Sequence, residues 1–459
     1  MQELQQLFKP KSIAIIGASN NPRKIGHEIM KNIIISGYEG KIYPINLEGK
    51  DVLGFKSYTS ILSISDEIDL AIIAIPASFV IDVLEECGRK GVKAVIVISS
   101  GFKEIGNIEL EEKLLSIVKK YGMRMLGPNV FGIYYAPSKL NATFGPSRIH
   151  PGKIAFITQS GALGIALMEW ATLHKIGLST VVSMGNKADI DEADILDYLS
   201  NDNETKAVII YMEGVKDGRK LMKSLINITL KKPVIIIKSG RSNVGAIAAA
   251  SHTGSMAGSD IVYTTAFKQS GALRADDLLQ AFDWAKLMVM QPPPKNKDCV
   301  ILTNGGGIGV LAADACEKED LNLPILPQDL QNELKKIMPI FGSSRNPIDL
   351  TGQAGEEEYF NSLRILMKDD RVSSIVLLYC QTAITDPIEI SNAILNVYRE
   401  FDTKKPIVVS FLGGEKCEEA MKKLEENSIP TYEIPERAIS SLAAYYKWYK
   451  RKINPTISY

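Results

Sequence analysis

The stretch IAFITQSGALG, from Ile154 to Gly164, decides the fold of this 459-residue chain. Its apolar residues predict a buried strand, and the polar pair and glycine that follow predict a tight turn into a helix. The same order recurs in IAIIGAS from Ile13 and in VILTNGGGIG from Val300. Ligands of open parallel sheets bind at the carboxyl ends of strands, where a helix offers free N–H groups and a partial positive charge. Three anion sites are therefore predicted.

Short apolar runs rich in Ile and Val alternate with longer amphipathic segments along the whole chain. This rhythm is typical of βαβ units whose parallel strands are covered on both faces. We predict an α/β protein with a Rossmann-like first domain (1–128) and two flavodoxin-like, doubly wound parallel-sheet domains (129–291 and 298–459). The last two are separated by QPPPKNKD, because Pro292–Pro294 cannot continue a helix.

Charge and cysteine usage exclude several classes of partner. Lys plus Arg and Asp plus Glu both number 53, so no global field attracts nucleic acid or an anionic membrane. The N-terminus lacks the features of a signal peptide, and no apolar run reaches membrane-spanning length. The cysteines are scattered without C-x-x-C spacing, which favours reduced core residues and a cytoplasmic location. No residue is assigned to a metal.

Two common nucleotide motifs are missing. Gly17 is followed by Ala18 and Ser19, which departs from the dinucleotide fingerprint G-x-G-x-x-G and disfavours a Rossmann oxidoreductase. Every Gly-Lys pair is followed by Ile or Asp, so a nucleoside triphosphate loop is absent as well. Chemistry on ATP would need another chain.

Several longer motifs together resemble one known family. They are IIGASNNPRKIGHEIMKN (15–32), LGPNVFGI (126–133), ITQSGALG (157–164), SMGNKADIDEADILDYL (183–199) and ASHTGSMAGSD (250–260). This set is similar to the alpha subunit of ADP-forming acyl-CoA (acetyl-CoA) synthetases, which are relatives of succinyl-CoA synthetase. TNGGGIGVLAADA and NPIDLTGQA resemble the ligase domain that lies in the beta subunit of succinyl-CoA synthetase, so the resemblance covers nearly the whole chain.

The resemblance implies the reaction acyl-CoA + ADP + phosphate ⇌ carboxylic acid + CoA + ATP. Coenzyme A would bind the first domain, and Mg²⁺ would accompany ADP and ATP. Because this chain lacks an ATP-grasp half, the family precedent requires an ATP-grasp beta subunit, commonly in an α2β2 assembly.

The resemblance also implies catalytic roles for two residues. His252 would be phosphorylated and would carry the phosphoryl group from an acyl phosphate to ADP, which suits a neutral imidazole near pH 7. Glu213 ends an apolar strand, where a carboxylate is out of pattern. It resembles the family glutamate that hydrogen-bonds the histidine and fixes its tautomer.

Three binding sites are implied by the same resemblance. The phosphate-binding residues would be Ser160, Gly161 and Ala162 in the second domain, and Gly305, Gly306 and Gly307 in the third. The CoA-binding residues would be Gly17, Ser19, Lys24, Gly26, Asn46, Pro76, Ser99, Gly101 and Phe102. Asn129 and Asn186 would border the acyl-phosphate pocket. The family often has cysteine where Val130 stands, so no thiol chemistry is assigned there.

Two rival functions stay open at this point. One is the Rossmann oxidoreductase, and the other is a CoA-sensing regulatory subunit that keeps the fold without the chemistry. Retention of both His252 and Glu213 counts against the regulatory subunit.

Overall fold

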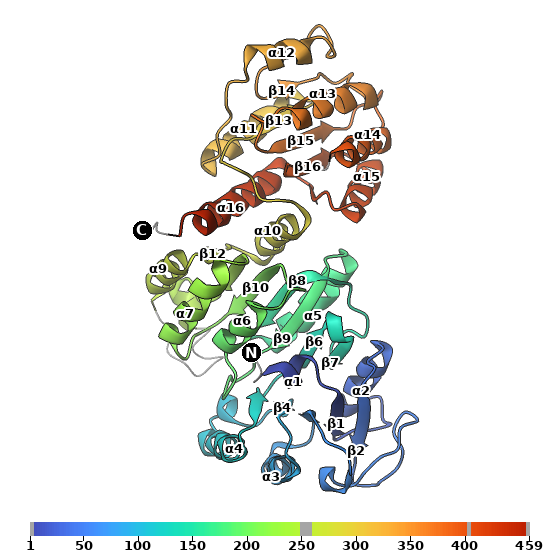
Figure 1. The fold of residues 1–459 in the computed structure, drawn as a ribbon, viewed down its shortest axis with the longest axis vertical. Helices are drawn as coiled ribbons and strands as arrows, with labels where there is room; N and C mark the ends of the chain where they lie inside the picture. Colours follow the sequence, from blue (N-terminus) through green and yellow to red (C-terminus); the bar gives the residue numbers. More distant parts are fainter. Residues whose placement is uncertain (1–3, 248–258, 402–404, 456–459) are drawn as a thin grey trace. The chain divides into compact units, whose positions relative to one another are not determined.

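The computed structural model describes residues 4–247, 259–401 and 405–455, and the chain folds as two compact units, Met1–Arg274 and Ala275–Tyr459 (Figure 1). The described residues form three mostly parallel sheets flanked by helices. The predicted α/β architecture is confirmed. None of the helices within these ranges is long and apolar enough to cross a membrane.

The first sheet of unit 1 is parallel and has the strand order β2-β1-β3-β4-β5. Strands β1, β3 and β4 are buried at every position, as expected for strands covered on both faces. Helix α2 packs on one face, and α3 and α4 pack on the other. The elements are α1 (Gln5–Phe8), β1 (Ser12–Ile16), α2 (Ile25–Ile35), β2 (Lys41–Ile45), β3 (Leu70–Ile73), α3 (Val80–Lys90), β4 (Ala94–Val97), α4 (Ile108–Tyr121) and β5 (Arg124–Leu126).

The second sheet of unit 1 has the order β12-β11-β10-β8-β9-β6-β7 among the described residues. Strands β8 to β12 run parallel, and β6 and β7 extend the sheet as an antiparallel pair beside β9. The elements are β6 (Gly132–Tyr135), β7 (Leu140–Thr143), β8 (Pro151–Thr158), α5 (Gly161–Leu173), β9 (Leu178–Ser183), α6 (Glu192–Leu199), β10 (Ala207–Met212), α7 (Gly218–Thr229), β11 (Val234–Lys238), α9 (Asp260–Ser270) and β12 (Leu273–Arg274).

One hydrophobic core joins the two sheets of unit 1. It contains Ile13 and Ile15 of β1 and Ile33 of α2, together with Ile133 of β6 and Leu140 of β7. Helix α2 packs directly on β7. Because the core is continuous, the loops of the first sheet are held in a fixed position relative to the second sheet.

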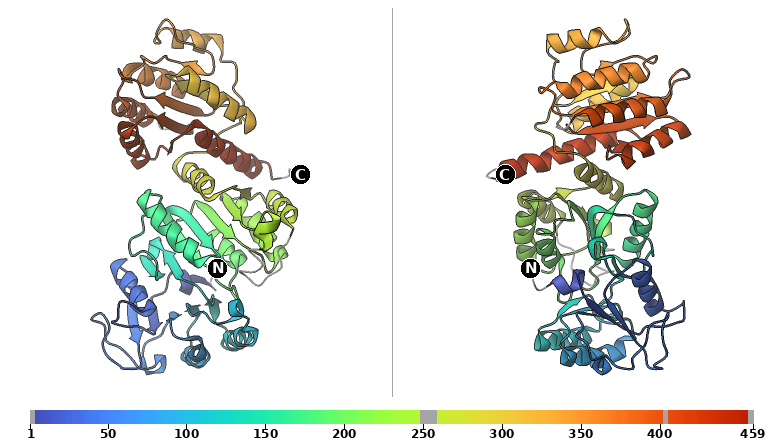
Figure 2. Two further views of the ribbon diagram at one scale, coloured as in Figure 1. Left: turned by 180° about the vertical axis from the view of Figure 1, so that it is seen from behind. Right: turned by 45° about the vertical axis from the view of Figure 1, so that its right-hand side comes forward.

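The third sheet lies in unit 2, is parallel and has the order β14-β13-β15-β16-β17. Helices α13, α14 and α15 cover one face, and α11 and α16 cover the other (Figure 2). The elements are α10 (Leu278–Met290), β13 (Val300–Thr303), α11 (Gly306–Lys318), α12 (Gln328–Lys335), β14 (Ile348–Asp349), α13 (Glu356–Lys368), β15 (Ile375–Cys380), α14 (Pro387–Glu400), β16 (Ile407–Leu412), α15 (Glu415–Glu426), β17 (Thr431–Tyr432) and α16 (Pro435–Ile453).

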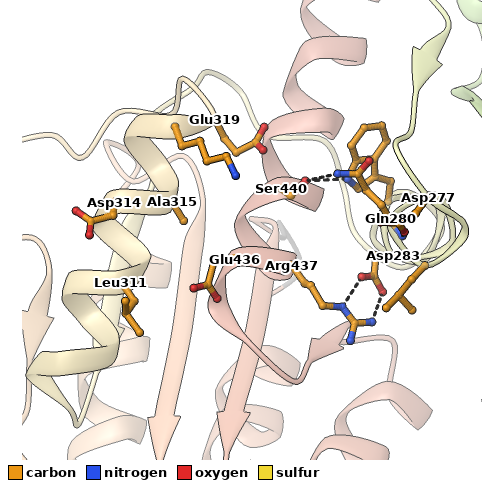
Figure 3. Close-up of a pocket in the computed structure, with 13 residues that line it drawn as sticks. Asp277, Gln280, Asp283, Leu311, Asp314, Ala315, Glu319, Glu436, Arg437 and Ser440 are labelled. Carbon is orange, nitrogen blue, oxygen red and sulfur yellow. Dashed lines mark hydrogen bonds and ion pairs between the residues drawn. The ribbon is translucent and has the colours of Figure 1, made fainter. Parts of the chain in front are cut away.

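Helix α10 belongs to unit 2, because it packs along α16. The Arg437 guanidinium donates to both carboxylate oxygens of Asp283, at 2.7 and 2.9 Å, and the Trp284 indole donates to the Ser440 hydroxyl (Figure 3). A cavity of about 370 Å³ lies between α10, α11 and α16. The domain limits drawn from the sequence group α10 with the middle domain, whereas its contacts in the structure join it to the third sheet.

All three sheets share one strand order. When the parallel strands of each sheet are numbered along the chain, each sheet reads 2-1-3-4-5, which is the flavodoxin-like order. In this order the chain switches direction between its first and third strands, and ligands bind in the crevice at that switch point. The three switch points are the carboxyl ends of β1 and β3, of β8 and β10, and of β13 and β15.

Candidate active site

Two glycines shape the switch point of the first sheet. Gly17 follows β1 with a φ of +93°, and a Cβ at this position would lie 2.3 Å from the Ala74 carbonyl oxygen. A Cβ on Gly26, in the first turn of α2, would lie 2.0 Å from the Gly17 carbonyl oxygen. No larger side chain fits at either position. The turn after β1, the first turn of α2 and the residue after β3 therefore pack closely against one another at the crevice.

The neighbouring loops are tied together and present unused polar groups. The buried His27 ring contacts the Ser19 carbonyl oxygen at 3.0 Å, and the Ser19 hydroxyl accepts from the Asn21 N–H. Asn46 donates to the Lys50 carbonyl and the Ser57 hydroxyl, while its buried Oδ1 has no hydrogen-bond partner among the described residues. A buried acceptor without a donor favours a ligand that brings one.

These loops line a cleft of about 1570 Å³ in unit 1. It begins at the turns after β1, β2, β3 and β4 and reaches Gln159 and the start of α5. The residues predicted from the sequence that line it are Gly17, Ser19, Lys24, Gly26, Asn46, Pro76, Ser99, Asn129, Gly161 and Ala162. Val130 also lines the cleft, so this part of its wall is apolar.

Gly101 and Phe102 are not among the residues that line the cleft. Phe102 is fully buried in the hydrophobic core of the first sheet. Gly101 has a φ of +114°, and its N–H donates to a Glu104 carboxylate oxygen that also accepts from the Phe102 N–H. The two residues therefore shape the loop that carries Ser99, and they do not line the cleft themselves.

Glu104 and Glu111 connect this loop to the second sheet. The Asn186 amide, in the loop between β9 and α6, donates to Glu104 at 2.6 Å and to Glu111 at 2.8 Å. Asn129 donates to the Asn186 side-chain oxygen at 3.4 Å. Burial raises the pKa of Glu104, but the hydrogen bonds from Asn186 and the backbone outweigh it and hold the pKa below its ordinary value. Neither glutamate was predicted from the sequence.

Helix α5 begins at the inner end of the cleft. Ser160 is its N-cap and accepts from the Leu163 N–H at 3.4 Å. Gly161 and Ala162 are exposed, so their N–H groups are accessible at the positive end of a 13-residue helix. Such an end is a ready site for a phosphate group.

Helix α11 of unit 2 begins in a similar way. Gly305 is its N-cap, and Gly306 and Gly307 are exposed. An Asp349 carboxylate oxygen lies 3.0 Å from the position that a Cβ on Gly306 would take. An anion at this helix end would therefore lie near a carboxylate, so its binding would need the backbone donors or a cation.

Glu213 follows β10 at the switch point of the second sheet, next to the end of β8. Its N–H donates to the Gln159 side-chain oxygen at 2.6 Å, and the Gly214 N–H donates to the same oxygen at 3.0 Å. Lys187 donates to the Gly214 carbonyl at 2.8 Å and to the buried Glu192 at 2.9 Å. Glu213 was predicted from the sequence, whereas Gln159, Lys187 and Glu192 were not.

His252 lies outside the described residues, in 248–258. The described residues on either side of 248–258 belong to unit 1, which also carries Glu213. Within the described residues, no three His, Cys, Asp or Glu side chains come together as a metal site requires.

Comparison with known proteins decides the family. Residues 11–136 match a CoA binding domain, residues 151–288 a succinyl-CoA ligase like flavodoxin domain, and residues 299–454 a ligase-CoA domain. The chain is 55% identical, over 98% of both chains, to the alpha subunit of acetate–CoA ligase [ADP-forming] I from Pyrococcus furiosus. The chain belongs to the family of ADP-forming acetate–CoA ligases. The resemblance drawn from the motifs is confirmed.

A solved structure supports the same assignment for the fold. Dinucleotide-forming acetyl-coenzyme A synthetase 1 of Ca. Korarchaeum cryptofilum, in complex with phosphate and ADP, matches with a TM-score of 0.97 at 44% identity over 100% of both chains. The acetate–CoA ligase [ADP-forming] of Methanocaldococcus jannaschii is 42% identical, and this chain spans 64% of its length. In extent the chain therefore corresponds to the alpha subunit of the Pyrococcus furiosus enzyme, and the longer relative carries an additional region.

Proposed function

We propose that this alpha subunit binds coenzyme A thioesters and catalyses acyl-CoA + ADP + phosphate ⇌ carboxylic acid + CoA + ATP together with a partner chain. The observation that carries the proposal is the cleft of about 1570 Å³, which runs from the glycine turn after β1 to the exposed start of α5. A CoA molecule held by its nucleotide end at the first sheet would direct its thioester toward that helix end. Acetate is the acid named for the relatives, and we take acetyl-CoA as the first substrate to test.

The residues of the cleft fit coenzyme A. Gly17, Ser19, Lys24 and Gly26 would hold phosphate groups through backbone N–H groups and the ammonium charge of Lys24. The orphan oxygen of Asn46 would accept a hydrogen bond from the ligand. Pro76 and Ser99 would form the wall, and Gly101 and Phe102 would fix its shape. Asn129 and Asn186 would border the acyl group.

The proposed reaction has three steps. A phosphate oxygen attacks the thioester carbonyl, the C–S bond breaks, and CoA leaves as the thiol with a proton, which gives an acyl phosphate. A ring nitrogen of His252 then attacks phosphorus, and the bond to the carboxylate oxygen breaks. Finally an oxygen of the ADP β-phosphate attacks the phosphohistidine, the N–P bond breaks, and ATP leaves.

Glu213 would support the second step. A carboxylate that accepts from one ring nitrogen of His252 fixes the tautomer and leaves the other nitrogen nucleophilic. It also stabilises the positive character that the ring gains on phosphorylation.

The phosphoryl group needs compensation for its charge. A helix end supplies about half a positive charge, against a phosphoryl charge of about two. The backbone N–H groups of α5 and α11, and Mg²⁺ that arrives with the nucleotide, would supply the rest. The residues that we assign to phosphate binding are Ser160, Gly161, Ala162, Gly305, Gly306 and Gly307.

The nucleotide half of the reaction requires a partner. We propose an ATP-grasp beta subunit as the partner, because this chain has no nucleoside triphosphate loop. The family precedent supports an α2β2 assembly, and the cysteine usage supports a cytoplasmic location. We keep three functional domains, 1–128 for CoA binding, 129–291 for the phosphohistidine carrier and 298–459 for the second ligase domain. Three successive family matches, over 11–136, 151–288 and 299–454, support a division into three, although the first match extends past residue 128.

Phosphorylation of the chain tests the proposal. We expect the full chain, given acetyl-CoA, Mg²⁺ and ³²P-labelled phosphate, to acquire an acid-labile and base-stable label. Label that persists in His252→Ala would overturn the assignment. Retention on CoA-agarose without any labelling, with or without the partner chain, would instead favour a CoA-sensing regulatory subunit.

A further inference from the structure

The Gln159 side chain makes a complete set of hydrogen bonds at the switch point of the second sheet. Its oxygen accepts from the N–H groups of Glu213 and Gly214. Its amide nitrogen donates to the Gly214 carbonyl at 2.8 Å and to the Glu192 carboxylate. A glutamine amide offers two donor hydrogens and an oxygen that accepts two bonds, so all four positions are used.

Only one orientation of the amide is compatible with these neighbours. The oxygen faces two N–H groups, and the nitrogen faces a carbonyl and a carboxylate. A flipped amide would oppose donor to donor and acceptor to acceptor at all four contacts. The surroundings therefore lock the side chain of Gln159.

A buried ion pair contacts the Gln159 amide through Glu192. The side chains of Lys187 and Glu192 are 12% and 3% exposed, and their charged groups are 2.9 Å apart. Lys187 has a φ of +54° and donates to the same Gly214 carbonyl that Gln159 binds. The peptide after Glu213 is thus held at its N–H by Gln159, and the next carbonyl is held by both Gln159 and Lys187. Glu213 therefore projects from a backbone that is fixed on both sides.

We propose that Gln159 is a positioning residue that orients Glu213 for phosphoryl transfer. This inference rests on the proposed function, because it takes Glu213 as the carboxylate that serves the phosphorylated histidine. Gln159 also lines the inner end of the cleft, but the four hydrogen bonds of its amide are made to the chain itself. It sets the direction of the Glu213 side chain through the backbone on either side of it.

The test measures single-turnover phosphorylation of the full chain with acetyl-CoA, Mg²⁺ and labelled phosphate. Gln159→Met keeps the length of the side chain and removes all four bonds, and we expect it to slow phosphorylation about 10²-fold. Binding of CoA, measured by calorimetry, should stay unchanged. A double-mutant cycle with Glu213→Gln then shows whether Gln159 acts on the rate through Glu213. Once Glu213 is an amide, Gln159→Met should change the rate by less than about threefold.

Two further variants keep the test decisive if Gln159→Met folds poorly. Gln159→Glu alone places a carboxylate against both Glu192 and the Gly214 carbonyl. The exchange Gln159→Glu with Glu192→Gln restores a donor facing an acceptor at the contact between positions 159 and 192 without changing the net charge. We expect the exchange to recover at least about tenfold of the rate lost by Gln159→Glu. The matched control is Gln291→Met in unit 2. Gln291 also accepts from a backbone N–H, of Ile407, and donates to a backbone carbonyl, of Ser428. Gln291→Met should lower the stability of the chain but leave the rate of phosphorylation unchanged.

The outcomes separate the two claims. Rate losses of Gln159→Met and Glu213→Gln that multiply would overturn the positioning role, because Gln159 would then act independently of Glu213. Recovery absent from the exchanged pair would also count against it. If the label persists in His252→Ala, the proposed function itself fails, whatever Gln159 does.

Discussion

At the scale of single residues, Glu213 was recognisable from the sequence and its supports were not. A carboxylate directly after an apolar strand breaks the local pattern, so it can be recognised from the sequence alone. Gln159 lies 54 residues away and meets Glu213 only because β8 and β10 are neighbours in the sheet. Lys187 and Glu192 are polar residues in a polar stretch, where no local signal reveals that both side chains are buried.

The first prediction concerns the charge of Glu213. Glu213→Gln keeps the size of the side chain and its backbone bonds to Gln159, but the amide cannot stabilise the positive character of the histidine ring. We expect single-turnover phosphorylation to fall by about 10² to 10⁴, with CoA affinity unchanged. Rapid-quench measurement of labelled chain gives the rate. A rate within about threefold of wild type, well below that window, would assign Glu213 to a strand end.

At the scale of elements, the strands that carry the site were predictable, and the short strands at the sheet edges were not. The uninterrupted apolar runs in β1, β8 and β13, each followed by a glycine-containing turn, indicate parallel strands. The pair β6 and β7 was missed because LNAT, the sequence of β7, has half its residues polar although all four are buried. Its partners across the sheet and α2 supply that burial.

The switch points of the second and third sheets share an arrangement of side-chain hydrogen bonds that the sequence did not reveal. Asn304 follows β13 and bonds both the N–H and the carbonyl of Cys380 at the end of β15, as Gln159 bonds the turn after β10. An amide at the end of the first strand therefore fixes the end of the third in both sheets. Only in the second sheet does the fixed residue carry a carboxylate.

The second prediction concerns the loop that carries Gly101. The pKa of Glu104 is lowered in the folded chain, so the ionised carboxylate stabilises the junction above the ordinary pKa of 4.5. That contribution is lost as the pH falls below 4.5 and through the folded pKa. We therefore expect Glu104→Gln to lower the melting temperature at neutral pH, and this difference to shrink in acid.

Calorimetric melts of wild type and Glu104→Gln between neutral pH and pH 3.5 measure the difference in melting temperature. The lower limit is about one unit below the ordinary pKa of glutamate. Glu109→Gln is the control, because Glu109 is an exposed residue of the same segment. Equal differences at every pH would contradict the role of the Glu104 charge.

At the scale of the whole chain, the sequence predicted serial α/β domains, and the structure groups them into two compact units. The first two sheets share one core, because α2 packs on β7 and apolar residues of both sheets meet there. The prolines at 292–294 lie just past the end of α10 but do not separate this helix from unit 2. Its side chains contact α16, about 150 residues further along the chain, and no local pattern reports such a contact.

The last prediction concerns the ion pair that joins α10 to α16. Asp283 has a side chain only 6% exposed, and burial raises its pKa even though Arg437 donates two hydrogen bonds to it. Arg437→Met leaves this carboxylate buried without its partner, which costs about 3 to 5 kcal/mol when one member of a buried pair is removed. Asp283→Leu with Arg437→Met removes both charges, and we expect it to recover most of that loss.

Because the chain has two units, hydrogen exchange is the measurement, read separately on α10 and α16 and on the strands of unit 1. Arg437→Met should lower the opening free energy of α10 and α16 and leave unit 1 unchanged. Lys447→Met serves as the control, because its pair with Glu319 is 3.3 Å long and the lysine side chain is 56% exposed. A surface pair of this kind should change stability by less than about 0.5 kcal/mol. Equal effects of Arg437→Met and Lys447→Met would mean that the Asp283–Arg437 pair does not hold α10 to unit 2.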